Sequence, residues 1–170
     1  MGATADNGGS FITGKKTMWK GILAGVMLAV VQPVWAADLV DATDPQQVMN
    51  LARGYGSANL STDGVGDPMI TGRMDGTRYS IMFYGCSDNR NCKTIRFSSA
   101  WATDGQYTLE DMNAWNEGYR FGKAYLDDEG DPVLEMNVNL LYGVSRRNLD
   151  DTIDWWRVAL GQFKSEVLGQ

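Results

Sequence analysis

The sequence has 170 residues, of which 44% are hydrophobic, enough for one domain of ordinary size with its own core. Its 15 basic and 21 acidic side chains give a formal net charge of -6, which opposes binding to nucleic acid or to an anionic membrane surface. The chain has no histidine, so Ser-His-Asp and Cys-His catalysis and the commonest metal ligand are excluded.

Residues 1–36 have the pattern of a secretory signal peptide. A basic segment precedes the apolar run GILAGVMLAVV, which is too short to span a bilayer because a span takes about twenty apolar residues. Small side chains then predict cleavage between Ala36 and Ala37. We expect a periplasmic protein with a single domain over residues 37–170 and no stable membrane insertion. Cleavage would leave 12 basic and 20 acidic side chains, a formal charge of -8.

The segment DPQQVMNLARGYG (residues 44–56) predicts the first helix. Asp44 is its expected cap, and Pro45 suits its first turn. The residues expected on its buried face are Val48, Leu51, Ala52 and Tyr55.

A short strand is expected near residues 58–62, followed by a hairpin. The segments PMITGRM and TRYSIMFYG flank Asp75 and Gly76, two residues that tolerate positive φ and predict a two-residue turn. This register places Arg73 opposite Arg78, a repulsive pair.

The two cysteines, Cys86 and Cys92, are predicted to form a structural disulfide. Their C-x5-C spacing is not that of redox catalysts or zinc sites, and an exported protein can keep a bridge. The flanking segments alternate as half-buried strands do. If the cysteines face each other, the cross-strand partners are Phe83–Ile95, Ile81–Phe97, Tyr84–Thr94, Met82–Arg96 and Ser80–Ser98. Apolar residues then share one face.

The segment TLEDMNAWNEGYRFG (residues 108–122) predicts a second helix, with Thr108 and Asp111 as a capping pair. Asn113 and Asn116 lie on its flank, placed to tie the helix to the hairpin that follows. The stripe expected to pack on the inner face of the sheet is Leu109, Met112, Trp115 and Tyr119.

The segments GKAYLDD and PVLEMNVNL predict a hairpin with DEGD as its turn. Arg120 and Lys123 lie at the junction between helix and strand, where they are placed to pair with Asp127 or Glu135. The residues expected on the apolar face are Ala124, Leu126, Leu134, Met136, Val138 and Leu140.

A group of carboxylates lies at the tip of this hairpin: Asp127, Asp128, Glu129 and Asp131. A calcium loop centred on Gly130 would need Tyr125 as its first ligand, so we expect no metal ion and no other cofactor. We expect these four side chains to be solvated residues of a turn.

Residues 148–168 predict a final helix, with Asp150 and Asp151 near its positive end. Its inward residues are expected to be Leu149, Ile153, Trp156, Leu160, Phe163 and Val167. The order is helix, four strands, helix, two strands, helix. This order predicts the α+β class, with an antiparallel sheet of about five or six strands backed by helices.

The segments FYGC, CKTIRFSSAW and MNAWNEGYRFGKAYLDDEGDPVLEMNVNLLYGVS, with the closing amphipathic helix, resemble the YbjN family of bacterial sensory transduction regulators. The resemblance covers nearly all of residues 37–170. It implies a fold similar to that of the type III secretion chaperones, a non-enzymatic role and assembly into a homodimer. It brings no known active site.

Two functions follow. The first is a non-enzymatic protein-binding module of the periplasm, acting as a chaperone-like or signalling adaptor for an unidentified protein partner. Its candidate contact residues are Trp115, Asn116, Arg120, Trp155 and Trp156, although tryptophans at helical spacing belong mainly to a core. The alternative is a carboxylate-dependent hydrolase that acts on an envelope polymer, with the acidic hairpin tip lining a cleft.

Overall fold

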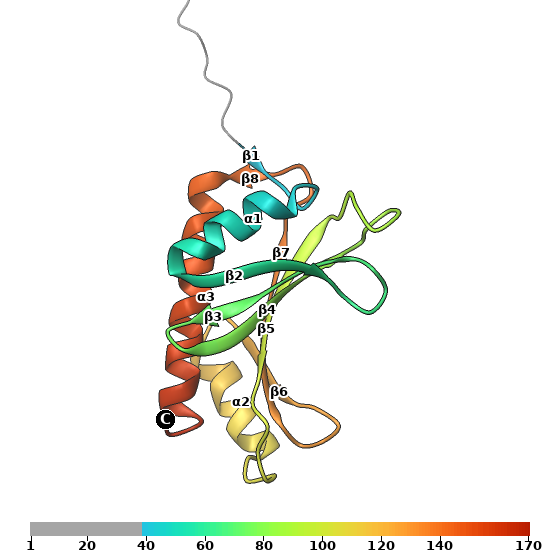
Figure 1. The fold of residues 1–170 in the computed structure, drawn as a ribbon. Helices are drawn as coiled ribbons and strands as arrows, with labels where there is room; N and C mark the ends of the chain where they lie inside the picture. The colour runs from blue at the N-terminus through green and yellow to red at the C-terminus, as the bar shows by residue number, and fades with distance from the viewer. Residues whose placement is uncertain (1–38) are drawn as a thin grey trace, which may run out of the picture. The chain divides into compact units, whose positions relative to one another are not determined.

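The computed structural model describes residues 39–170, and the predicted signal peptide with its cleavage site at Ala36 and Ala37 lies outside them. The described residues form a six-stranded antiparallel sheet, a two-stranded sheet and three α-helices (Figure 1). The predicted α+β class is confirmed.

The strands are β1 (Leu39–Val40), β2 (Gly56–Thr62), β3 (Pro68–Met74), β4 (Thr77–Tyr84), β5 (Thr94–Ala100), β6 (Lys123–Leu126), β7 (Pro132–Asn139) and β8 (Val144–Ser145). The helices are α1 (Pro45–Ala52), α2 (Leu109–Gly118) and α3 (Arg146–Glu166), and a 3-10 turn spans Arg53–Tyr55.

The large sheet has the strand order β2-β3-β4-β5-β7-β6, and every neighbouring pair is antiparallel. β7 therefore lies inside the sheet, and its hairpin partner β6 forms the edge. Within residues 39–170, no helix is both long and apolar enough to cross a membrane.

The predicted registers of both hairpins are confirmed. Cys86 and Cys92 form a disulfide, and the strands beside it pair as predicted, with Phe83 opposite Ile95. At the other turn, Asp75 and Gly76 have φ values of 46° and 77°. Arg73 does face Arg78 there, and its Nη1 donates a hydrogen bond of 2.6 Å to the carbonyl oxygen of Gly76.

The helix caps are also those predicted. The Asp44 side chain accepts hydrogen bonds from the backbone N–H groups of Gln46 and Gln47. Thr108 and Asp111 form a capping box at the start of α2. These caps satisfy N–H groups that the first turn of a helix leaves without a partner.

The core lies between the helices and one face of the large sheet. α3 runs along that face, α1 packs against β2 and β3, and α2 packs against β6 at the other end (Figure 1). The largest fully buried side chains include Trp115, Trp156, Phe83, Phe97 and Phe163. Alternate residues of the strands point to the opposite face, which no helix of the described residues covers.

Three details differ from the sequence-based expectations. The second helix was predicted over residues 108–122 but ends at Gly118, because the backbone of Tyr119 is extended. Leu109 was predicted in the buried stripe of α2 but is 67% exposed. It is the first residue of a helix that packs on the short edge strand β6, while α3 occupies the centre of the sheet. The pair β1 and β8 was not predicted, because two residues are too few for an alternation to show.

Candidate partner-binding groove

Two of the predicted contact residues, Trp115 and Trp156, belong to the core. They are 1% and 0% exposed. The Trp115 ring meets Phe163 edge-on with ring centroids 5.0 Å apart, and the Trp156 ring lies 5.6 Å from that of Phe97. Both indoles therefore offer almost no surface to a docking protein.

Trp155 has the opposite environment, although it is the direct neighbour of Trp156. Successive helical residues are rotated by about 100°, so Trp155 leaves the buried face of α3 and is 42% exposed. Its ring lies 4.8 Å from the ring of Phe121, which is itself 38% exposed. Two large aromatic side chains thus pack on each other in contact with solvent.

Phe121 is held there by the way α2 ends. The indole N–H of Trp115 donates a hydrogen bond of 2.9 Å to the carbonyl oxygen of Gly122. Gly122 has a φ of +83°, and a Cβ atom built on it would lie 2.9 Å from a methyl carbon of Leu134. Glycine is needed at this bend because other residues disfavour positive φ and would crowd Leu134.

Asn116 anchors the same connection from α2. Its Oδ1 accepts a hydrogen bond of 2.8 Å from the backbone N–H of Ala124, and its Nδ2 donates one of 2.9 Å to the carbonyl oxygen of Ala124. The predicted tie between the flank of this helix and the following hairpin is therefore present. Asn116 acts on the backbone of β6 and positions the segment that carries Phe121.

We expect Asn116→Ala to lower the free energy of unfolding by about 1–2 kcal/mol, because Ala124 is 3% exposed and would lose two hydrogen-bond partners. Asn113→Ala is the matched control, since Asn113 lies on the same helix and is exposed. Urea denaturation followed by circular dichroism measures both variants. Equal losses of stability in the two would show that the bonds to Ala124 contribute little.

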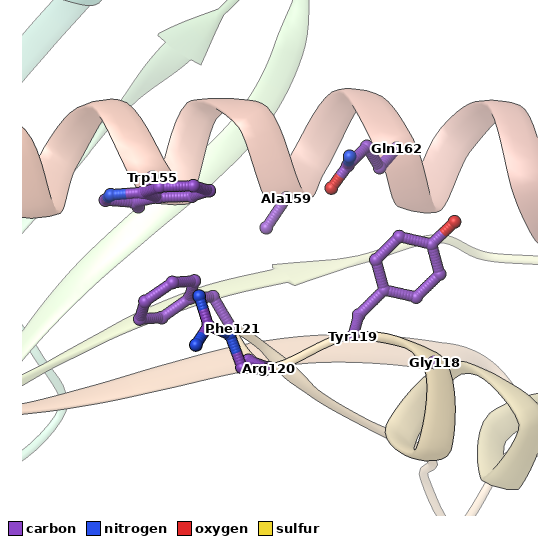
Figure 2. A pocket seen from close by; sticks show the side chains of 7 residues that line it. All are labelled: Gly118, Tyr119, Arg120, Phe121, Trp155, Ala159 and Gln162. Atoms are coloured by element: carbon purple, nitrogen blue, oxygen red, sulfur yellow. The ribbon is translucent and has the colours of Figure 1, made fainter.

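A groove of about 180 Å³ separates the segment after α2 from α3. Figure 2 shows Tyr119 and Phe121 reaching toward α3, with Trp155, Ala159 and Gln162 directed back at them. The residues that line the groove are Gly118, Tyr119, Arg120, Phe121, Trp155, Ala159 and Gln162. We call it the aromatic groove.

Arg120 supplies the positive charge of the aromatic groove. Its guanidinium carbon lies 5.8 Å from the centroid of the Phe121 ring, within the range of a cation–π interaction. The side chain is exposed, and among residues 39–170 it forms none of the ion pairs. Arg120 is therefore free to meet a carboxylate of another molecule.

A second hollow of about 430 Å³ lies on the other side of the same segment, beside β7. It shares Tyr119, Arg120 and Phe121 with the aromatic groove. The other lining residues are Asn116, Gly122, Lys123, Glu135, Met136 and Asn137. We call it the edge pocket.

Glu135 is a buried carboxylate at the border of the edge pocket. Its Oε1 accepts a hydrogen bond of 2.9 Å from the hydroxyl of Tyr125 and one of 3.3 Å from Arg96, and its Oε2 lies 3.8 Å from Nζ of Lys123. Burial, and then the hydrogen bond to Glu135, raises the pKa of Tyr125 to about 12. Glu135 is thus paired within the protein, and the predicted pairing with Lys123 is present. The pairing predicted for Arg120 is not found among the described residues.

The acidic hairpin tip forms a turn that its own carboxylates stabilise. Asp127 Oδ1 accepts hydrogen bonds from the backbone N–H groups of Glu129 and Asp131. Asp131 Oδ1 accepts from the backbone N–H and the hydroxyl of Thr103, and Asp128 is exposed. None of these four carboxylates lines the aromatic groove or the edge pocket. Within the described residues, no group of three His, Cys, Asp or Glu side chains is placed to hold a metal ion.

Comparison with known families matches residues 44–168 to the model of the YbjN family, described as "Putative bacterial sensory transduction regulator". The chain belongs to the YbjN family. No curated protein matches the sequence significantly. The YbjN description is that of a regulator rather than of an enzyme, in agreement with a regulatory or binding role.

In this YbjN chain, sequence reasoning found three of the residues that border the aromatic groove and the edge pocket, which are Trp155, Arg120 and Asn116. It missed Phe121 and Gln162. Gln162 lies two turns after Trp155 on α3, so helical spacing alone could have associated the two. Phe121 follows the helix and gives no such signal, because its contact with Trp155 exists only in the folded chain.

Proposed function

We propose that this YbjN protein is a non-enzymatic protein-binding module of the periplasm, a chaperone-like or signalling adaptor that holds its partner in the aromatic groove. The observation that carries the proposal is the contact between Phe121 and Trp155, whose rings lie 4.8 Å apart with 38% and 42% of their surfaces exposed. Exposed aromatic clusters beside an arginine have the composition of binding hot spots.

The carboxylates argue against a hydrolase. Hydrolysis by a carboxylate pair needs two acidic side chains that face each other across a substrate. Here Asp127 and Asp131 accept hydrogen bonds from the backbone of their own turn and of Thr103, and Glu135 is paired with two cations. These contacts give the three carboxylates a structural role. They therefore support binding, rather than hydrolysis, as the function of the protein.

The groove is tested by a photo-crosslinking residue, p-benzoylphenylalanine, placed at position 155 in the full chain in living cells. We expect it to crosslink to a discrete protein, because the aromatic replacement keeps the groove. The matched control carries the same residue in place of Val65, which is 77% exposed in the loop between β2 and β3.

Excess unlabelled wild-type protein should compete for the crosslink in extracts, whereas the double variant Phe121→Ala, Trp155→Ala should compete at least tenfold less well. Equal crosslinking from positions 155 and 65, or equal competition, would refute the proposed groove. A crosslink to a second copy of the chain would identify the expected homodimer as the partner.

Export is a separate part of the proposal and has its own test. The disulfide between Cys86 and Cys92 supports it, because such bridges persist in oxidising compartments. We expect mass spectrometry of the protein from the periplasmic fraction to find an N-terminus at Ala37. An uncleaved chain retained in the cytoplasm would contradict export while leaving the groove proposal standing.

A further inference from the structure

The hydrogen bonds of β7 show which of its backbone groups lack a partner strand. The backbone N–H of Trp101 donates to the carbonyl oxygen of Pro132, and that of Leu140 donates to the carbonyl oxygen of Lys93. In the β5–β7 register, the even-numbered residues of β7 therefore bond toward β5. The odd-numbered residues turn their N–H and C=O groups to the other side.

β6 covers only part of that other side. It pairs with Val133 and Glu135 and begins at Lys123, where the chain leaves the sheet toward α2. Asn137 and Asn139 lie beyond it, both exposed, and no strand of residues 39–170 pairs with their outward backbone groups. The edge pocket lies at this point, because Asn137, Phe121 and Arg120 line it.

The neighbouring edges are protected by side chains. The outward N–H and C=O of Ala124 on β6 are both bound by Asn116. On β2, at the opposite edge of the sheet, Arg53 Nε donates to the carbonyl oxygen of Ala58. No strand of residues 39–170 pairs with the outward backbone groups of Leu60 and Thr62 on β2, but neither residue lines the aromatic groove or the edge pocket.

We propose that the partner is bound as an extended segment that adds a short antiparallel strand to β7 at Asn137–Asn139. This inference rests on the proposed function and names its binding mode. An added strand would form main-chain hydrogen bonds to Asn137 and Asn139, as in other cases of strand addition to a sheet edge. Its side chains would alternate between the two faces of the sheet.

The surroundings specify the chemistry of that segment. A residue opposite Asn137 would point to the outer face. Arg96 and Lys123 share the single carboxylate of Glu135 there, which leaves one positive charge in excess. Arg120, which borders the edge pocket, adds a second positive charge. The two neighbours of the residue opposite Asn137 would point toward Phe121 and Met136. The segment should therefore carry an acidic residue between two apolar residues. Its negative charge would complement these cations, which form a positive site in a chain whose net charge is negative.

The probe is a phage-displayed library of random 12-residue linear peptides, selected on the full oxidised chain. We expect selected peptides to carry an acidic residue between apolar residues and to lose at least tenfold in affinity with Phe121→Ala, Trp155→Ala. Peptide binding should slow hydrogen exchange of the Asn137 and Asn139 amides at least tenfold. The Leu60 and Thr62 amides of β2 are the internal control and should not change.

Asn137→Pro removes the outward N–H, leaves the backbone hydrogen bonds between β7 and β5 in place, and should lower peptide affinity at least tenfold. It also removes the hydrogen bond that Arg96 Nε donates to Asn137 Oδ1, a loss that the alanine variant shares. Asn137→Ala keeps the outward N–H and should bind within threefold of wild type. If the Asn137→Pro variant does not fold, hydrogen exchange of the Asn137 and Asn139 amides in the wild-type protein tests strand addition instead. Peptides that need Trp155 but protect neither amide would overturn strand addition and leave the proposed function intact. Failure to select any peptide that depends on Trp155 would contradict both.

Discussion

Replacing Trp156 with alanine is expected to lower the free energy of unfolding by about 3–5 kcal/mol, because the change leaves a large cavity between α3 and the sheet. Trp156 is 0% exposed and packs on Phe97. The same change at Trp155, one residue earlier, should cost about 1 kcal/mol or less, because that ring is partly in solvent already. Chemical denaturation of the two variants measures the difference.

Trp156→Phe is the matched control for the cavity. Among the described residues, Nε1 of Trp156 is the buried side-chain polar atom without a hydrogen-bond partner, so phenylalanine removes no bond. We expect it to recover most of the stability lost in the alanine variant. Similar losses at positions 155 and 156 would mean that the burial of α3 described above is incorrect.

The second large effect concerns alkaline pH. Burial raises the pKa of Tyr79 from 10.0 to about 12, and its hydroxyl donates a hydrogen bond of 3.1 Å to the carbonyl oxygen of Ser57. Since the folded state holds this proton more tightly than the unfolded state, the resulting stability is fully present below about pH 10. It should be lost as the pH rises from about 10 to 12, by about 2–3 kcal/mol.

Urea denaturation of wild type and Tyr79→Phe at pH 9 and near pH 12 isolates this contribution, because all other titrating groups are common to the two proteins. The wild type should lose about 2–3 kcal/mol more than the variant over this interval. A parallel pH dependence would show that the phenol reaches water in the native state.

The sequence predicted local structure well because local rules determine it. A single assumption about Cys86 and Cys92 placed all the pairs between β4 and β5 correctly, since a strand has a side-chain period of two and a slip would reverse its faces. Asp44 and the Thr108–Asp111 pair identified the helix starts through side-chain hydrogen bonds that span only three residues.

The groove was only partly predictable, because it joins segments that are distant in the sequence. The stripe of Ile153, Trp156 and Leu160 could have marked Trp155 as an exposed neighbour, since it departs from the helical period of that stripe. No local pattern shows that Phe121 would meet Trp155. Nor does the β6–β7 hairpin reveal which of its two strands would pair with β5.

The place of β7 in the sheet sets the order in which the fold can be completed. β5 and β7 are neighbours in space, yet residues 101–131 separate them in the chain. Closing so long a loop costs conformational entropy before the contacts form, and non-local pairing of this kind slows folding. The rings of Trp156 and Phe163, from the C-terminal helix, complete the same core. A chain that is synthesised from its N-terminus therefore cannot complete the sheet or this core until β7 and α3 have been made.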